Sequence, residues 1–282
     1  MDYAIVIVTA FLAPGLTLSS GFGLGTVLLP AFALFFPAPA AIAATAVVHL
    51  FNNLFKGMLV GRDAHWPTIW RFGLPAIPAA IIGALLLAWL GRTETVFVWQ
   101  AGAMQFAPSG AGFAIGVTMM LFALLELQPW FQRLAAPPRL MPLGGIVMGF
   151  AGGLTGQQGA FRSMFLLKSG LDSRHYIATG VILAIIVDLA RLPGYFAAFT
   201  ASDLPLGGRD GLLIAAGTLS AFAGAWVGSR YVRKATIGTV RLIVAILMLA
   251  IGAGLALGLV GEQAHRGTDQ TISSELPPSH SR

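Results

Sequence analysis

Two short glycine-rich segments carry the residues of this sequence that are best suited to bind a ligand. One reads Ser19-Ser20-Gly21-Phe22-Gly23-Leu24-Gly25 inside an apolar stretch over 4–36, and the other reads Leu154-Thr155-Gly156-Gln157-Gln158-Gly159 inside an apolar stretch over 141–168. A helix that begins after a glycine break presents free backbone N–H groups and a positive dipole end, which favour an anion. We therefore expect half-helices to begin near Gly25 and Gly159, and the two breaks to form one anion site near the middle of the membrane. The ligands expected from the breaks are Ser20, Gly21, Gly23, Gly25, Thr26, Thr155, Gly156, Gln157, Gln158 and Gly159.

Arg162, Asp188 and Arg191 are charged residues that lie within apolar stretches. Arg162 follows the second break by one turn, where a cation costs about 2.5–3.5 kcal/mol in a membrane helix and needs a carboxylate or a bound anion. Asp188 and Arg191 are three residues apart on one predicted helix, so they can pair with each other. That pairing would leave Arg162 as a substrate ligand, and a structural network of all three charges is the alternative.

A polar stripe marks one face of the first full-length apolar segment. His49, Asn52, Asn53 and Lys56 follow the spacing i, i+3, i+4 and i+7, and such a stripe usually faces the interior of a helix bundle. We expect Asn52 and Asn53 to contact the substrate, with hydrogen bonding between helices as the alternative. We expect His49, Asp188 and Arg191 to have a structural or a coupling role. His49 could take part in coupling because a histidine can relay a proton.

Composition narrows the class of protein. Of the 282 residues, 56% are hydrophobic and 10% charged, and the mean hydropathy is +0.80, so a soluble enzyme, a disordered chain and a nucleic-acid-binding protein are excluded. There is no cysteine, and the five histidines lack metal-ligand spacing. We therefore predict no metal, no cofactor, no catalytic residue and no nucleic-acid partner; the partners are the lipid bilayer and a small anion.

The apolar segments predict an all-α polytopic membrane protein. Full spans are expected over 38–60, 70–90, 107–127, 175–199, 211–229 and 241–260, and the two broken regions are too long for one span each. The spacing between Gly25 and Gly159 is the same as the spacing between Ala44-Thr45 and Ala178-Thr179. At a slightly longer spacing, Gly83-Ala84 matches Gly224-Ala225. We infer two repeats, 1–134 and 135–261, each a broken helix pair followed by three spans. A polar tail over 262–282 is expected to be disordered.

The positive-inside rule favours broken regions that enter the membrane and return on the same side. If they cross, the loop arginines and lysines divide almost evenly between the two faces. If they return, one face collects Lys56, Arg62, Arg71, Arg133, Arg139, Lys168, Arg174, Arg230, Arg233, Lys234 and Arg241, and the other keeps Arg92, Arg209, Arg266 and Arg282. This topology inverts the two halves in the cytoplasmic membrane and leaves both termini outside.

At these residues the sequence resembles the sulfite exporter TauE/SafE family, also called TSUP. The matching pieces are Ser20-Gly-Phe-Gly-Leu-Gly-Thr-Val-Leu-Leu-Pro30, Ala43-Ala-Thr-Ala, Gly152-Gly-Leu-Thr-Gly-Gln-Gln-Gly159, Arg162-Ser163, and Ile177-Ala-Thr-Gly180 through Asp188-Leu-Ala-Arg191. The resemblance implies transport of sulfur-containing oxyanions, such as sulfite or organosulfonates. Met164 stands where the second half should match Pro30, Gln157-Gln158 replaces glycine, and Arg162 belongs to this half alone, so the substrate can differ from that of other members.

We predict a secondary transporter that exports such anions. An anion channel would use the same ligands without coupling to protons or sodium. An intramembrane enzyme with a Ser109–His49 dyad is a weaker alternative, because no oxyanion-hole motif accompanies the two residues. The internal repeat favours a transporter over an enzyme.

Glycines in the flanks of the second break are expected to serve close packing of helices and not binding, because of their spacing. They are Gly145, Gly149 and Gly153.

Overall fold

The computed structural model describes residues 4, 6–13, 24–34, 36, 38–93, 95–102, 104–198, 208–231 and 237–260. The first break up to Gly23 and the tail over 262–282 lie outside these residues, so Ser20, Gly21 and Gly23 are not described. The chain is mainly helical, as the sequence predicts. The elements are α2 (Leu24–Ala33), α3 (Ala38–Val60), η1 (Gly61–Asp63), α4 (Trp66–Gly91), β1 (Trp99–Ala101), β2 (Met104–Phe106), α5 (Gly110–Leu127), α6 (Pro129–Gln132), η2 (Pro138–Leu140), α7 (Met141–Thr155), α8 (Gly159–Leu166), α9 (Ser173–Ala198), α10 (Gly208–Tyr231) and α11 (Ile237–Ala256), with further helical residues over 6–13.

Four of the described helical segments are long and apolar enough to cross a membrane. They are Ala38–Asp63, Trp66–Gly91, Gly110–Leu127 and Ser173–Phe196, and shorter apolar helices cover Gly211–Val227 and Leu242–Ala256. Their positions agree with the predicted spans to within a few residues. The start of α5 differs because the Ser109 side chain accepts a hydrogen bond from the Gly112 N–H at 3.1 Å and so caps the helix at Gly110. The hydrogen bond gives Ser109 a structural role at the start of α5.

The second broken region folds as an antiparallel pair of helices. Helix α7 ends at Gly156, whose φ of +77° is the left-handed conformation that glycine adopts readily. Helix α8 then runs back beside α7: Gly144 leaves room for the Phe165 ring, and Gly152 packs against Gln158. The Ala136 N–H donates to the Met164 carbonyl at 3.0 Å, so the end of α8 lies beside the segment that leads into α7.

Helices α4 and α7 pack with their backbones in close contact. A Cβ added to any of three glycines of α7 would overlap a carbonyl group of α4. The pairs are Gly145 with Phe72, Gly149 with Ala76, and Gly153 with Ala80. These glycines therefore serve close packing, as their spacing predicts.

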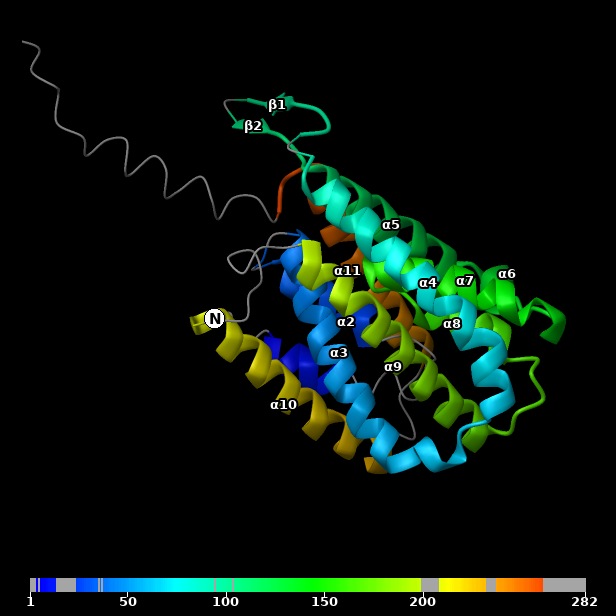
Figure 1. The fold of residues 1–282 in the computed structure, drawn as a ribbon. Helices are drawn as coiled ribbons and strands as arrows, with labels where there is room; N and C mark the ends of the chain where they lie inside the picture. The colour runs from blue at the N-terminus through cyan, green and yellow to red at the C-terminus, as the bar shows by residue number, and fades with distance from the viewer. Residues whose placement is uncertain are drawn as a thin grey trace, which may run out of the picture.

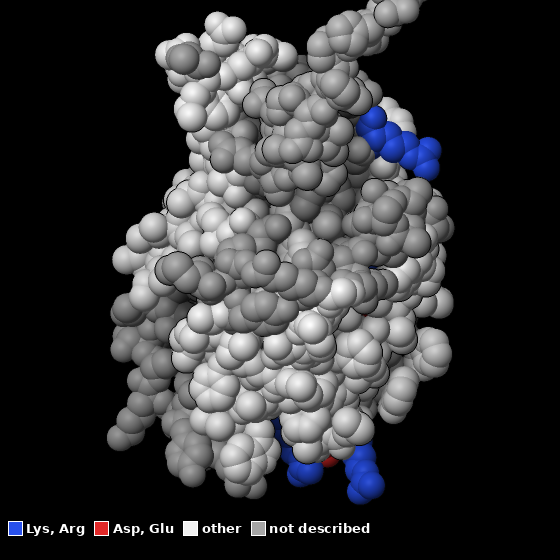
Figure 2. All heavy atoms as spheres, turned by 90° about the vertical axis from the view of Figure 1, so that its left-hand side faces the viewer, with Lys and Arg blue, Asp and Glu red and all other residues white. Residues whose placement is uncertain are grey.

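The two ends of the helix bundle carry the described surface charges. At one end the Arg174 Nε donates to Asp63 Oδ2 at 2.6 Å, joining η1 to the start of α9. At the other end the β1–β2 hairpin, which the sequence did not predict, projects from the body (Figure 1), and Trp99 Nε1 donates to the Leu257 carbonyl at 2.9 Å. On the face seen in Figure 2, basic side chains lie at the bottom and the upper right, and an uncharged band separates them among the described residues. This distribution is typical of a protein surrounded by lipid.

Asp172 caps the start of α9 outside the apolar span. Its carboxylate accepts the His175 backbone N–H at 2.9 Å. That hydrogen bond, with the neighbouring His175 ring, lowers the pKa of Asp172 below its ordinary value.

Candidate functional site

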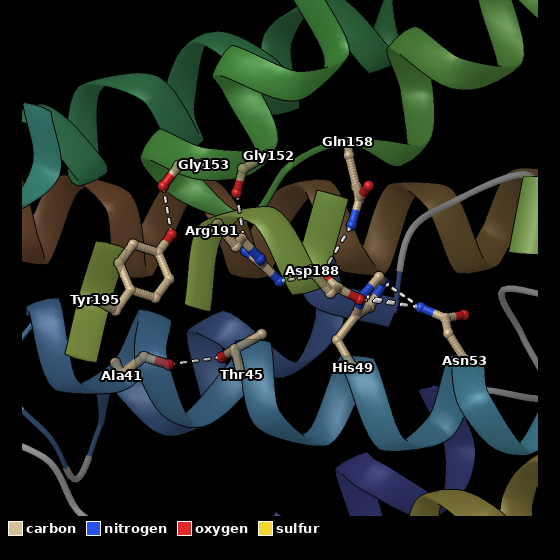
Figure 3. A network of polar contacts seen from close by, with 10 residues as sticks. All are labelled: Ala41, Thr45, His49, Asn53, Gly152, Gly153, Gln158, Asp188, Arg191 and Tyr195. Carbon is tan, nitrogen blue, oxygen red and sulfur yellow. Dashed lines mark hydrogen bonds and ion pairs between the residues drawn. The ribbon is translucent and has the colours of Figure 1, made fainter. Parts of the chain in front are cut away.

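Asp188 is the centre of a buried hydrogen-bond network that joins three parts of the fold (Figure 3). Its Oδ1 accepts from Arg191 Nη2 at 2.7 Å and from Gln158 Nε2 at 3.2 Å. Its Oδ2 accepts from His49 Nδ1 at 2.6 Å and from Asn53 Nδ2 at 3.4 Å. A carboxylate can only accept, so Nδ1 of His49 carries the proton in this contact. The predicted Asp188–Arg191 pair is present, and the bonds from α3 and from the second break were not predicted.

Arg191 and Tyr195 hold the end of α7. The last carbonyl groups of a helix have no partner within the helix, and a cation is favourable at this negative end of the dipole. Arg191 Nη1 donates to the Gly152 carbonyl at 2.9 Å, and the Tyr195 hydroxyl donates to the Gly153 carbonyl. A Cβ on Gly156 would lie 3.1 Å from the same Nη1 atom. Sequence reasoning missed Tyr195, although it lies one turn beyond Arg191 on the same face of α9.

Several buried polar atoms at the second break and on the facing helices α3 and α9 have no partner among the described residues. Gln157 and Asn52 are 3% and 0% exposed, and neither the nitrogen nor the oxygen of either side-chain amide is hydrogen-bonded within the described structure. Arg191 Nε and Gln158 Oε1 are also unpaired there. Because Gln158 turns its NH₂ group to the Asp188 carboxylate, its Oε1 must face away as an acceptor. An unpaired buried polar atom costs about 1–3 kcal/mol, and folded proteins contain few of them, so a cluster of them points to a partner from outside the chain.

Two cations near the break have no counter-ion in the described part of the chain. Arg162 on α8 is partly exposed and packs against α9, where a Cβ on Gly180 would lie 3.3 Å from its Nε. Lys56 on α3 is 9% exposed. Neither forms an ion pair with a described carboxylate, and the two charges repel each other. Asp188 attracts Arg162 from a distance, but its oxygens are already occupied, so the site has a surplus of positive charge.

The two broken regions meet at Gly25 and Gly156. A Cβ on Gly25, in the first turn of α2, would lie 3.0 Å from the Gly156 carbonyl oxygen and 3.7 Å from the Thr45 side chain. Gly159 opens α8 as predicted, and no side chain caps that helix start. Of the first break, only Gly25 and the backbone of Thr26 are described.

Two predicted ligands have their donors engaged within the protein. Thr155 Oγ1 donates to the Ala151 carbonyl of its own helix at 3.1 Å, because a threonine in the last turn of a helix can reach the carbonyl four residues earlier. Asn53 donates to Asp188 and lies 3.0 Å from the His49 ring. Hydrogen bonding between helices therefore accounts for Asn53, whereas Asn52, on the same stripe, keeps both polar atoms unpaired.

Comparison with known proteins identifies the family. The family described as Sulfite exporter TauE/SafE matches residues 6–255. No curated protein and no solved structure matches the chain. The family is one of membrane transporters of sulfite and related sulfur anions, not of enzymes, and the apolar helices agree with a multi-pass membrane protein. The match covers both broken regions and the whole Asp188 network, and the chain therefore belongs to the sulfite exporter TauE/SafE family.

Proposed function

We propose that this chain is a secondary transporter that exports small sulfur-containing oxyanions, such as sulfite or organosulfonates. The anion binds at the break between α7 and α8, against α3 and close to the start of α2. This proposal is carried by the unpaired buried amide and guanidinium atoms, together with two cations that form no ion pair among the described residues.

The chemistry of this cluster fits an anion. Arg191 neutralises Asp188, so Arg162 and Lys56 give the region its net positive charge. The amides of Asn52 and Gln157 can turn their NH₂ groups toward an oxyanion, and Arg191 Nε can donate beside them. The uncapped N-terminus of α8 adds backbone N–H groups. Water or a donor on the substrate can satisfy the Gln158 oxygen.

The packing of the helices supports two structural repeats, 1–134 and 135–261. Helices α3 and α9 occupy equivalent positions and pack on each other, as do α5 and α11, and α4 packs on α9 where α10 packs on α3. Gly83 of α4 packs on the Phe150 carbonyl of α7, and the matching Gly224 of α10 packs on the Phe11 carbonyl. Each of these contacts thus has a counterpart in the other half. We propose that the site lies between the repeats.

The antiparallel α7–α8 pair supports a re-entrant topology for the second half. It starts and ends near the Ala136–Met164 hydrogen bond, at the end that also carries Lys168 and the Arg174–Asp63 pair. We propose that this basic end faces the cytoplasm, that the repeats are inverted and that both termini lie outside. His49, bonded to Asp188, is our candidate for proton coupling, which distinguishes a transporter from a channel with the same ligands.

Thermal unfolding of the detergent-purified protein in the presence of sulfite, sulfate and organosulfonates tests the site. A ligand at one hundred times its dissociation constant stabilises the folded state by about 2.7 kcal/mol. We expect such a shift for the wild type and its loss in Arg162→Gln. Arg174→Gln, which removes an exposed arginine from the surface pair with Asp63, is the matched control and should keep the shift. An undiminished shift in Arg162→Gln would mean that the anion does not bind at this site.

A further inference from the structure

We propose that the site selects doubly charged anions over singly charged anions of similar size, and that Lys56 sets this preference. The inference rests on the proposed anion site and adds the charge of its substrate. It is carried by a second cation, buried on a different helix from the partly exposed Arg162, for which the described structure offers no carboxylate partner.

Lys56 belongs to the face of α3 that forms the site. It lies one turn beyond Asn52, whose amide is buried and unpaired, and two turns beyond His49, which contacts Asp188. Its side chain is 9% exposed. Arg162 repels it, and no ion pair with a described carboxylate offsets this repulsion.

A count of charges then indicates the substrate. The buried carboxylates among the described residues are Asp188 and Glu126 of α5. Arg191 pairs with Asp188 directly at 2.7 Å, and Glu126 forms no ion pair with Arg162 or Lys56. Arg162 and Lys56 remain, and cations are rarely buried without compensation in a protein or a membrane. A singly charged anion would neutralise one of them and leave the charge of the other uncompensated. An anion with two charges neutralises both, so it should bind more tightly.

A different role for Lys56 is to extend its ammonium group to the membrane surface, as lysines near helix ends do. Val60, the last residue of α3, follows only four residues later. In that case removing the charge would not change the choice between anions. The two roles therefore predict different results for the same variant.

The test compares sulfate with methanesulfonate, which are close in size, keep a fixed charge near neutral pH and differ by one unit of charge. Their affinities for the detergent-purified full chain are measured by calorimetry, with sulfoacetate and 2-hydroxyethanesulfonate as a second pair for organosulfonates. We expect the wild type to prefer the dianion by at least about tenfold, since a second charge at close range is worth more than this in a partly buried site. Lys56→Met should lose most of that preference and bind the monoanion about as well as the wild type.

Three further variants separate the possible outcomes. Lys56→Arg keeps the charge and should keep the preference, and Lys168→Met, which removes an exposed lysine after α8, should behave as wild type. If Lys56→Met keeps the preference while Arg162→Gln loses both anions, the role of Lys56 is wrong and the proposed site stands. If Arg162→Gln binds both anions normally, or the wild type binds neither, the proposed site itself is wrong.

Discussion

Two groups of charged side chains lie on neighbouring helices of the described structure, and they differ in whether the protein supplies the opposite charge. Around Asp188 the carboxylate oxygens accept hydrogen bonds from α3, from the second break and from Arg191 of its own helix. Arg162 and Lys56 form no ion pair with a carboxylate in the described structure. The first group therefore resembles a structural element, and the second has the properties of an incomplete site.

This difference suggests how the two groups work together. The Asp188 network fixes His49, Gln158 and, through Arg191, the last turn of α7. It therefore fixes the break beside which the free cations lie. The ion pair of Asp188 with Arg191 positions the site. Arg162 and Lys56, which form no such pair in the described structure, leave a place for the anion. Substitutions in the first group should affect folding, and substitutions in the second should affect binding.

The largest effect on stability is expected for Asp188→Asn. This change leaves Arg191 buried without a counter-charge, and loss of one partner of a buried pair costs about 3–5 kcal/mol. Asp63→Asn is the matched control, because it breaks the exposed pair with Arg174, a type of contact worth about 0–1 kcal/mol. Denaturant unfolding in detergent measures both free energies. Equal losses in the two variants would mean that the Asp188 network does not support the fold.

A smaller and more local effect is expected for Gly180→Ala. The added Cβ would lie 3.3 Å from Arg162 Nε, so the guanidinium must shift by a few tenths of an ångström. We expect anion affinity to fall about fivefold, roughly the equivalent of one weakened hydrogen bond, with little change in stability.

Gly57→Ala is the control for that substitution. Gly57 follows Lys56 on α3, but its Cβ would face α9, 3.1 Å from Ile185 Cδ1 and 3.9 Å from Val181 Cγ1. Anion affinity should therefore stay unchanged in this variant. An equal fall in both variants would attribute the effect to packing between α3 and α9, not to Arg162.

Sequence reasoning succeeded where the interaction is local. Gly156 and Gly159 delimit the second break, and Asp188 pairs with Arg191 one turn away, because both features depend on residues a few positions apart. The same holds for Gly149, whose spacing in a small-residue series predicted its packing against α4. Each of these features follows from helix geometry alone.

The remaining contacts depend on which helix faces which, and periodicity along one segment does not contain that information. His49 and Asp188 are 139 positions apart. The stripe on α3 indicated a buried polar face, but not that Asn53 would bond to Asp188 while Asn52 would stay unpaired. Thr155 was predicted as a ligand from its place in the break, whereas its hydroxyl donates to the turn before it.

The most direct test of the central claim is to locate a bound anion in an experimental structure. Selenate is close to sulfate in shape and charge, and its selenium can be placed by anomalous X-ray scattering from crystals grown with the anion. We predict one peak at the α7–α8 break, within hydrogen-bonding distance of the Arg162 guanidinium and the Gln157 or Asn52 amide. A peak elsewhere in the chain, or none at a selenate concentration that stabilises the protein, would contradict the account.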